Sequence, residues 1–455
     1  MGHRNSRRDF LKQSSMAGFG FWVAGGITRG DVKKVAKVDS VNIACIGVGG
    51  KGDSDSNHAG DVGNVVAICD IDDNTLNAKA AKYPSAKKYN DYRKMLEEMD
   101  KQIDAVTVST PDHTHAPAAL MAMRMKKHVY CQKPLTHTVQ EARLMRETAA
   151  KYGVATQMGN QGTAENGLRT AVEAIQSGAI GPVHEAHVWT NRPVWPQAPK
   201  VTKRPDGEDP IPPHVHWDLW IGTAPMRPYK GDRTYHDFNW RGWWDFGTGA
   251  LGDMACHTAN MAFMALKLGY PTSVVAENDP INPETYPGWA KITFQFPARG
   301  EMPPVKFVWY EGKRGNEKLL PTTELLKGQK PSSSGSLLVG EKGTLYSPND
   351  YGARYMLLPR ETFADYKSPE KKLARNPASD TDLGMKQEWV EAIKGGPPAL
   401  SNFNYAGMLT ETILLGNVAM RAGKLLEWDG PEMKFTNSPE ANALLSIEPR
   451  SGWKV

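Results

Sequence analysis

A glycine-rich turn is the feature of this chain whose residue types point most directly to chemistry. An apolar run at residues 41–46 ends in Gly47-x-Gly49-x-x-Gly52, and Asp70 closes a second apolar run. In a dinucleotide-binding fold, such glycines form a tight turn that lets the backbone and a helix N-terminus approach a pyrophosphate, while the acid binds the adenosine ribose. The sequence therefore predicts a dinucleotide site formed by Gly47, Gly49, Gly50, Gly52 and Asp70.

Two further groups carry polar side chains that could act on a bound substrate. Residues 109–115 (STPDHTH) and 131–135 (CQKPL) each end an apolar, strand-like run. Residues 247–257 lead into a helix, in which the i, i+4 spacing puts Asp253 and His257 on one face. If the strands are parallel, their carboxyl ends line the cofactor crevice, where a nicotinamide would lie.

With these motifs in this order, the chain resembles the Gfo/Idh/MocA oxidoreductases, the family of glucose–fructose oxidoreductase and inositol dehydrogenase. The family hallmarks are the glycine-rich turn, a T-P-x-x-x-H motif, an E-K-P motif and a D-x-G-x-H-x-x-D motif. The resemblance covers roughly residues 40–430. It implies an N-terminal Rossmann domain and a C-terminal α/β domain whose large open sheet often builds oligomer contacts, so a homo-oligomer is expected.

The resemblance also implies a role for each matching residue. Lys133 would hydrogen-bond the reacting hydroxyl or carbonyl, His257 would be the general acid/base, and Asp253 would be its partner and a substrate ligand. These residue types suit oxidation of an alcohol, since an imidazole can take the hydroxyl proton and an ammonium can stabilise the developing alkoxide. A carboxylate beside the imidazole would stabilise the imidazolium. The cofactor side would include Thr110, Pro111, His115, Gln132 and Lys133.

Two departures from the family motifs affect these expectations. Gln132 replaces the usual Glu before Lys133, which removes a charge that could pair with the lysine. Ala255 and Asn260 replace the Gly and the last Asp of the histidine motif. Asn260 can hydrogen-bond a sugar hydroxyl but cannot act as a base, so the substrate contacts of typical inositol dehydrogenases are in doubt.

Charge favours NAD over NADP as the cofactor. Asp70 is followed by Asp72 and Asp73, with no arginine nearby. Three carboxylates would repel a 2′-phosphate. The His113/His115 and His214/His216 pairs lack cysteine or acidic ligands at metal spacing, so no metal site is expected.

Tryptophans concentrate just before the helix expected to carry Asp253 and His257. Seven of the thirteen lie between Trp189 and Trp244. They can pack in a core, or they can stack on the apolar faces of sugar rings. The second alternative concerns Trp195, Trp240, Trp243 and Trp244.

Periodicity predicts two kinds of domain. Up to residue 160, short β-rich runs alternate with helical patterns, which indicates a doubly wound parallel sheet of Rossmann type. Strands are expected at 41–46, 64–69, 103–109, 128–131 and 154–158, and helices at 91–99, 115–126 and 139–152. Beyond residue 160, runs of strands followed by helices indicate an α+β domain around a large, mostly antiparallel sheet. A helix is expected at 254–266, and residues 311–336 read as a polar, mobile loop.

The composition and the N-terminal motif indicate which partners and which cellular compartment to expect. The 455 residues carry a net charge of +5 and no long basic run, which argues against a nucleic-acid partner. The cysteines, Cys45, Cys69, Cys131 and Cys256, form no CxxC pair and mostly sit in apolar runs, so no disulfide is expected. Residues 6–12 (SRRDFLK) match the twin-arginine export motif. We therefore expect a signal and linker at 1–38, a Rossmann domain at 39–160, a substrate and oligomerisation domain at 161–430, and a tail at 431–455.

The export signal shapes the functional hypothesis. The twin-arginine machinery carries folded proteins to the periplasm, which has no dependable nicotinamide pool, so a nucleotide would be loaded beforehand and stay bound. The leading interpretation is an NAD(P)-dependent oxidoreductase acting on a ring hydroxyl of a sugar or cyclitol. One alternative is an NAD-dependent glycosidase that works by transient C3 oxidation, elimination, hydration and re-reduction. A second alternative is an inactive, nucleotide-bound sensor or structural protein.

Overall fold

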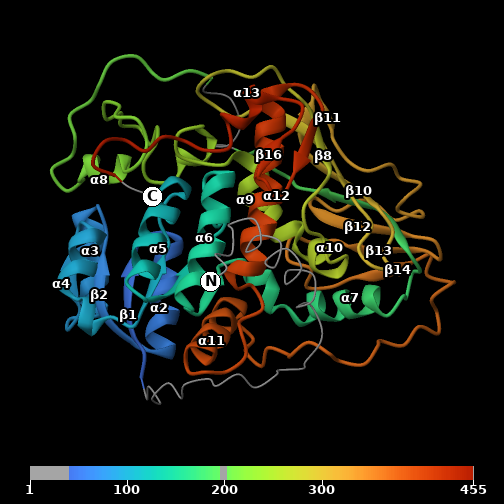
Figure 1. Cartoon of the computed structure of the whole chain (residues 1–455), viewed down its shortest axis with the longest axis horizontal. Helices are drawn as coiled ribbons and strands as arrows, with labels where there is room; N and C mark the ends of the chain where they lie inside the picture. The colour runs from blue at the N-terminus through green and yellow to red at the C-terminus, as the bar shows by residue number, and fades with distance from the viewer. Residues whose placement is uncertain (1–39, 195–201, 454–455) are drawn as a thin grey trace, which may run out of the picture.

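The computed structural model describes residues 40–194 and 202–453 (Figure 1). A parallel sheet near the amino terminus and a larger mixed sheet form the two halves, and helices α6 (Val139–Tyr152) and α12 (Phe403–Ala422) pack against each other between them (Figure 1). Among the helices of these residues, none is both long and apolar enough to cross a membrane. The predicted export motif at 6–12 lies outside the described residues.

The first sheet has six parallel strands in the order β3-β2-β1-β4-β5-β6. They are β1 (Asn42–Ile46), β2 (Asn64–Cys69), β3 (Lys87–Tyr89), β4 (Ala105–Val108), β5 (His128–Cys131) and β6 (Thr156–Met158). The connecting helices are α2 (Lys51–Val62), α3 (Asp73–Lys82), α4 (Tyr92–Glu98), α5 (His115–Arg124) and α6. The strand order reverses between β1 and β4, which places the ligand crevice at their carboxyl ends. The predicted Rossmann fold is confirmed.

Local sequence signals explain the ends of α6. The Thr138 hydroxyl accepts the Glu141 N–H while the Glu141 carboxylate accepts the Thr138 N–H, which is a capping box. Gly153 ends the helix with a φ of 63°, a conformation that glycine adopts at little cost. Strand β4 is buried throughout, as expected when helices cover both faces of a parallel sheet.

The second sheet has ten strands and is mostly antiparallel, with β7 and β10 paired in parallel. Its order is β14-β13-β12-β7-β10-β9-β8-β15-β16, and β11 pairs only with β10. The strands are β7 (Val183–Trp189), β8 (Ser273–Asn278), β9 (Trp289–Phe296), β10 (Val305–Arg314), β11 (Glu317–Lys318), β12 (Gly335–Gly340), β13 (Thr344–Ser347), β14 (Met356–Leu358), β15 (Leu426–Asp429) and β16 (Lys434–Phe435). This confirms the predicted architecture of the second domain.

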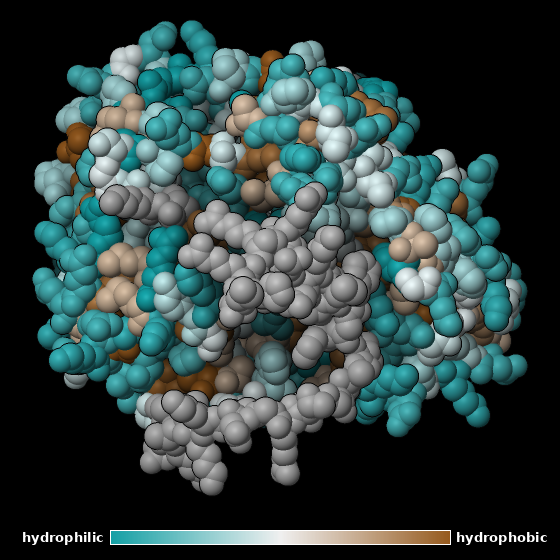
Figure 2. Space-filling model, in the orientation of Figure 1, coloured by the Kyte–Doolittle hydropathy of each residue, from teal (hydrophilic) through white to brown (hydrophobic). Residues whose placement is uncertain are grey.

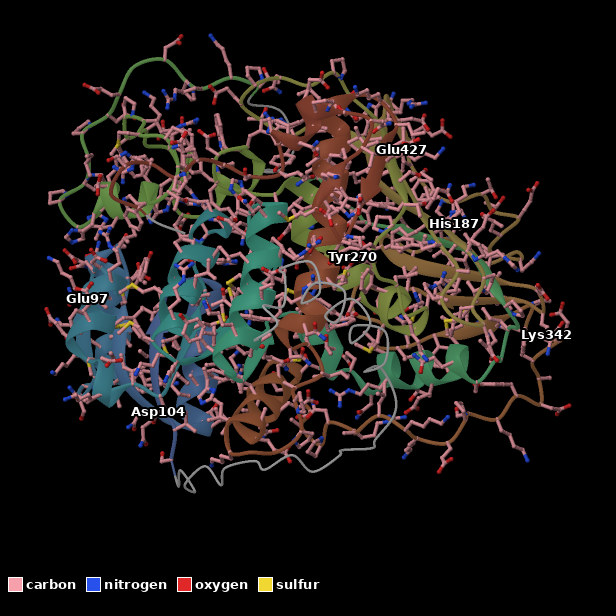
Figure 3. The ribbon with its side chains drawn as sticks, in the orientation of Figure 1. Glu97, Asp104, His187, Tyr270, Lys342 and Glu427 are labelled. Carbon is pink, nitrogen blue, oxygen red and sulfur yellow. The ribbon has the colours of Figure 1, made fainter. Side chains whose placement is uncertain are left out.

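Helices of the second domain join it to the first. They are α7 (Asn166–Gln176), α8 (Trp217–Ile221), α9 (Gly249–Thr258), α10 (Asn260–Ala265), α11 (Thr381–Ile393), α12 and α13 (Pro439–Asn442). Arg143 of α6 donates to both carboxylate oxygens of Glu411 in α12, at 2.9 and 2.5 Å. The ring of Tyr270, labelled in Figure 3, lies 5.0 Å below the Arg143 guanidinium. One hydrophobic core runs through both halves.

Three elements differ from the sequence prediction. The expected helix at 254–266 begins earlier, at Gly249, and divides into α9 and α10 at Ala259. Residues 311–336 are not a loose loop, because β10 continues to Arg314 and Leu326 is fully buried against the second sheet. Residues 431–455 contain β16, which extends that sheet by pairing with β15.

Candidate active site

The glycine-rich turn connects β1 to α2 at the crevice. Gly47 has a φ of 77°, and a Cβ there would lie 2.7 Å from the Ser109 carbonyl oxygen; a Cβ at Gly52 would lie 2.1 Å from the Gly47 oxygen. Only glycine fits either position. A Cβ at Gly50 would meet no atom within 4 Å, so this side of the turn is open.

This open turn fits a dinucleotide pyrophosphate. Gly50 precedes α2 and provides no side-chain cap, and the N–H groups of Gly49, Gly50 and Lys51 make no hydrogen bond within the described part of the chain. Unpaired N–H groups at the positive end of a helix bind phosphate oxygens. The turn therefore offers the donors that the sequence predicted.

Asp70 holds the outer end of the turn. Its carboxylate accepts the N–H of Val48 at 2.9 Å and that of Asp72 at 3.0 Å, and burial raises its pKa. Each oxygen keeps a second lone pair with which to accept a ribose hydroxyl. Asp72 and Asp73 face His214 and His216 at 3.7 and 3.2 Å, so the expected acidic corner carries histidines as well.

A segment of the second domain crosses this corner. The Asp73 N–H donates to the His214 carbonyl at 2.8 Å, and the His216 N–H donates to the Ile71 carbonyl at 2.9 Å. Asp72 and Val215 form an isolated antiparallel bridge between these bonds. We refer to residues 214–216 as the strap, because they lie across the chain just beyond the end of β2.

His115 joins the two strand-end loops. Its ring nitrogens lie 2.7 Å from the Thr110 carbonyl and 2.8 Å from the Pro134 carbonyl, and burial lowers its pKa to about 4. Both nitrogens are thus occupied by the protein, and the residue is buried. His115 positions the loops that carry Thr110 and Lys133, and it has no ring nitrogen left for a cofactor.

The side chain of Gln132 points toward the buried carboxylate of Asp55 and not toward the ammonium of Lys133. Its amide nitrogen donates to Asp55 at 2.7 Å, and the Ser109 hydroxyl donates to the same oxygen at 2.7 Å. Lys386 of α11 and Lys51 bind the other oxygen at 2.6 and 3.1 Å. Burial would raise the pKa of Asp55, but the two lysines hold it well below its usual range. A glutamate at position 132 would place a second charge against Asp55, which explains the glutamine.

Lys133 and Asp253 form the central ion pair. The Lys133 ammonium lies 2.8 Å from the Asp253 carboxylate and 2.8 Å from its backbone oxygen. Lys133 follows β5 in the first domain, whereas Asp253 lies on α9 in the second. The Thr248 hydroxyl just before α9 donates to Asp112 at 2.7 Å, which fixes α9 against the 109–115 loop. The structure therefore brings together the two predicted motifs.

His257 lies one turn after Asp253 and is buried. Burial lowers its pKa well below 6.5, and the Lys133 charge lowers it further. Its Nδ1 atom is buried and has no hydrogen-bond partner among the described residues, and its ring packs edge-on to Tyr351 at 4.9 Å. The Asp253 carboxylate hydrogen-bonds Lys133, and its negative charge opposes the lowering of the His257 pKa, which favours the imidazolium.

Asn260 does not contact a substrate. It is fully buried, its amide nitrogen donates to Thr163 at 2.9 Å, and its oxygen accepts the Tyr405 hydroxyl at 2.6 Å. The expectation that Asn260 could bind a sugar hydroxyl is therefore wrong. Its amide joins the start of α10 to α12 within the core.

The tryptophan-rich segment forms a core of its own. Trp240 is 6% exposed and Trp243 2%, and both pack in a cluster with Trp217, Trp220 and Phe246. Trp244 is half-buried and packs on Tyr286. Core packing, the first of the two alternatives, holds for these three residues, and Trp195 lies outside the described residues. The four cysteines are buried and free, as expected.

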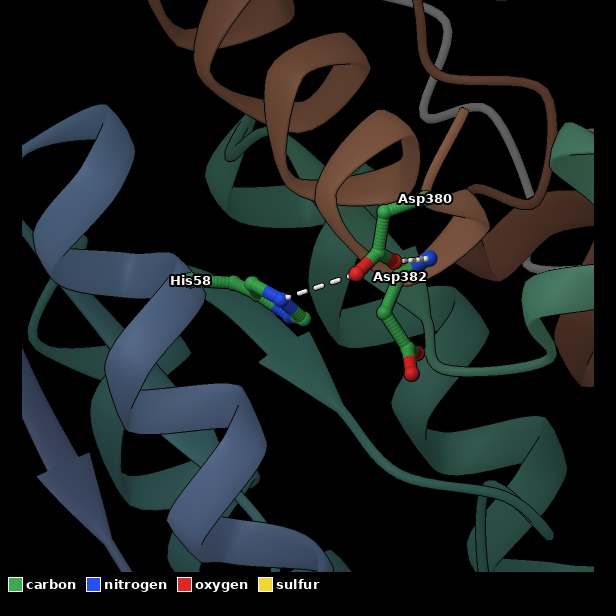
Figure 4. Close-up of side chains that lie close together, drawn as sticks. All are labelled: His58, Asp380 and Asp382. Atoms are coloured by element: carbon green, nitrogen blue, oxygen red, sulfur yellow. Dashed lines mark hydrogen bonds and ion pairs between the residues drawn. The ribbon is translucent and has the colours of Figure 1, made fainter. Parts of the chain in front are cut away.

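One group within the described residues has the geometry to hold a metal ion. His58, Asp380 and Asp382 gather where α2 meets the start of α11 (Figure 4). Asp380 already accepts the N–H groups of Asp382 and Leu383, and Lys51 pairs with Asp382 at 2.9 Å. The carboxylates are thus neutralised by a helix end and a lysine, and the group stabilises the α2–α11 contact.

The sequence analysis missed several site residues. Asp55 lies on the buried face of α2, with Gly52, Ser56 and Ala59, and Lys386 lies on the buried face of α11. Helical periodicity could have revealed both as charges at core positions. Arg192 lies in an irregular segment after β7, and Arg241 lies in a short 3-10 helix (Asn239–Gly242), so neither follows a periodic pattern.

Comparisons with known proteins match both halves of the chain. Residues 41–160 match a family model described as "Oxidoreductase family, NAD-binding Rossmann fold", and residues 186–302 match one described as "Oxidoreductase family, C-terminal alpha/beta domain". The chain belongs to the Gfo/Idh/MocA family. The first matched range contains the glycine turn, Asp70 and Lys133, and the second contains Asp253 and His257, so the ion pair joins the two family domains.

Individual relatives match over shorter stretches. Inositol 2-dehydrogenase of Salmonella typhimurium is 34% identical over 128 residues, 27% of this chain and 38% of the relative. A glycosyl hydrolase family 109 protein of Solibacter usitatus is 33% identical over 156 residues, 30% of this chain and 35% of the relative. The chain thus spans about two fifths of the length of the curated relatives it matches.

A solved structure matches over most of the fold. The WlbA dehydrogenase from Bordetella pertussis, solved with NADH and UDP-GlcNAcA, superposes with a TM-score of 0.59 at 15% identity, covering 86% of this chain and 99% of that one. At this identity the match shows the shared fold.

Proposed function

We propose that this protein is an NAD-dependent oxidoreductase that acts on a ring hydroxyl of a sugar or cyclitol. The observation that carries the proposal is the Lys133–Asp253 ion pair beside a buried, neutral His257, at the carboxyl ends of the strands next to an open glycine turn. The inositol 2-dehydrogenase relatives support a polyhydroxylated substrate.

The side chains divide the work of alcohol oxidation. When bound, the nicotinamide accepts the hydride. His257 takes the hydroxyl proton, since its lowered pKa keeps it neutral and able to accept one. Lys133 donates a charge-assisted hydrogen bond to the oxygen as negative charge develops there. Asp253 holds the ammonium in place at 2.8 Å.

We further propose that the nucleotide stays bound. The strap pairs with the backbone around Asp72 and lies next to Asp70, the expected ribose ligand, so it would hinder release of the adenosine half. A retained cofactor suits export of the folded protein by the twin-arginine machinery, with function in the periplasm. The enzyme would then restore NAD itself, for example by passing the hydride to a second sugar.

A second candidate is an NAD-dependent glycosidase. The similarity to a glycosyl hydrolase family 109 protein favours it, and transient oxidation and re-reduction of one substrate would also restore a trapped cofactor. His257 and Lys133 would serve the same oxidation step. The two candidates differ in product: a glycosidase releases an alcohol from a glycoside with no net redox change.

The first test is to denature the purified, unsupplemented protein and identify released nucleotide by chromatography and absorbance. Stoichiometric NAD(H) is expected. The intact protein is then mixed with sugars, cyclitols and aryl glycosides, while absorbance at 340 nm reports NADH and chromatography reports aglycone release. A protein that holds NAD but transforms none of these would support the inactive sensor, and failure to bind NAD at all would overturn the proposed function.

A further inference from the structure

Within the residues that the structure describes, three cations act on the carboxylate of Asp253. Lys133 lies 2.8 Å from it, and the Arg241 Nε atom lies 3.7 Å from the same oxygen. Burial would raise the pKa of Asp253, but Lys133, Arg241 and Arg192 together hold it well below its usual range. One ionised carboxylate thus faces three permanent or near-permanent positive charges.

Among the described residues, the guanidinium of Arg192 forms an ion pair with no carboxylate. It follows β7, and its backbone N–H and oxygen bond Thr190 and Gly312. Its guanidinium makes no hydrogen bond or ion pair in the part of the chain that the structure describes, and its Nε atom is buried. A buried donor without an acceptor costs about 1–3 kcal/mol, more for a charged group, so an anion that accepted from the half-buried Arg192 would be stabilised.

Arg241 also lies beside Asp253, the carboxylate on which the charge of Arg192 acts. The guanidinium stacks over the rings of Phe238 and Trp240, at 4.1 and 4.2 Å, and one terminal nitrogen donates to the Phe238 carbonyl. Its side chain is 21% exposed, so it keeps donors toward solvent. Aromatic stacking orients an arginine without using up its hydrogen bonds.

Other carboxylates near the site do not neutralise these arginines. Burial raises the pKa of Asp112 to about 7, and its carboxyl accepts the Thr248 hydroxyl, so much of it is uncharged at neutral pH. Asp350 accepts the Thr258 hydroxyl at 3.2 Å and forms no ion pair with either arginine. The site therefore keeps an excess of positive charge.

We propose that the substrate carries an anionic group, a carboxylate or a phosphate on the sugar or cyclitol, which Arg192 and Arg241 bind while the reacting hydroxyl lies against Lys133 and His257. The planar guanidinium suits both anions because it can donate two parallel hydrogen bonds. This proposal rests on the proposed function and narrows its substrate class.

The test compares neutral and anionic forms of the same sugar. Binding of glucose, glucuronate and glucose 6-phosphate, and of the galactose equivalents, is measured by calorimetry on the NAD-loaded protein. At least one anionic sugar should bind ten-fold or more tightly than its neutral parent. Arg192→Gln and Arg241→Gln should each weaken that binding at least ten-fold, and by more than they weaken binding of the neutral sugar. The uronate and phosphate arms identify which anion is preferred.

Arg233→Gln is the matched control, because Arg233 is 69% exposed and, among the described residues, forms an ion pair with Asp237 alone. It should leave every affinity unchanged. Equal affinity for neutral and anionic sugars, or no binding of any anionic sugar, would overturn the inference. If the protein binds NAD and oxidises sugars but shows no preference for anionic ones, this inference fails and the proposed function stands. If the protein binds no NAD, the proposed function itself fails.

Discussion

Lys133 is the residue on which the proposed chemistry depends most directly. Its ammonium lies 2.8 Å from the Asp253 carboxylate, and it comes from the opposite domain. Lys133→Met keeps the length of the side chain but removes the charge, so the rate of NADH formation with the best sugar should fall at least about 100-fold. Retention of NAD, measured after denaturation, should not change. Lys151→Met, at an exposed position of α6, is the control. Turnover within three-fold of wild type in Lys133→Met would refute the assigned role.

The lowered pKa of His257 predicts how the rate of oxidation depends on pH. Its pKa lies well below 6.5, first because it is buried and second because of Lys133. A base must be unprotonated to accept a proton, so oxidation should remain constant from pH 8 down to 6.5 and decline only at lower pH. Single-turnover NADH formation across pH 4.5–8.5 measures this. His257→Asn should lower the rate and abolish the acidic decline; a decline centred at or above pH 6.5 in the wild type would contradict a buried, neutral base.

At the scale of elements, a buried charge network joins α2, β5 and α11. Lys386 is fully buried, its ammonium binds Asp55 at 2.6 Å, and it lies 3.6 Å from the centre of the Tyr130 ring. Lys386→Met removes one of the two positive charges that pair with the buried Asp55 carboxylate. The free energy of unfolding should therefore fall by about 3 kcal/mol. Urea denaturation measures the loss, and Lys394→Met at the exposed end of α11 is the control.

The double variant tests the cause of that loss. Asp55→Asn/Lys386→Met removes both charges, so it should be more stable than Lys386→Met alone if an uncompensated carboxylate is responsible. A double variant that is less stable than the single one would indicate that Lys386 acts through packing. Because Asp55 also binds Gln132, the single variant should slow NADH formation as well.

The strap makes a second prediction at this scale. His216→Pro removes the N–H that donates to Ile71, and the φ of −86° at this position is near that of proline. Loosening the strap should speed NAD release at least about ten-fold if each lost hydrogen bond is worth about 1.4 kcal/mol. Dialysis followed by nucleotide analysis gives the release rate. His216→Ala keeps the N–H and should behave like wild type; equal release from both variants would show that the strap does not retain the cofactor.

For the whole molecule, the sequence predicts what local patterns determine. Strand β2 and helix α6 match their predicted ranges because hydrophobic periodicity and a capping box define them. Strands β15 and β16 escaped prediction because they are short and exist only through pairing with distant segments. Dependence on distant segments also explains why the contacts of the site residues were not predictable. Lys133 pairs with Asp253, which lies 120 residues further along the chain. The Asn260 side chain points into the core because it hydrogen-bonds Thr163 and Tyr405, which are also distant in sequence.

One face of the molecule can be judged for apolar patches. On the face shown in Figure 2, hydrophilic residues dominate and apolar ones form small, scattered patches. Figure 3 places His187 over the second sheet, where its ring bonds Tyr310 and Glu185. The expected homo-oligomer remains a prediction, which size-exclusion chromatography with light scattering tests directly.

The predicted twin-arginine motif at residues 6–12 would direct the folded protein to the periplasm. The protein should be exported only after it has folded around its nucleotide, since the core and the ion pair both join the two domains. In a bacterium with a twin-arginine exporter, the full chain should appear in the periplasm with NAD bound. Arg7→Lys/Arg8→Lys should keep it in the cytoplasm, where it should still bind NAD, whereas Arg4→Lys should be exported normally. Periplasmic recovery of the double variant would exclude this route, and recovery of wild type without nucleotide would show that export does not depend on a trapped cofactor.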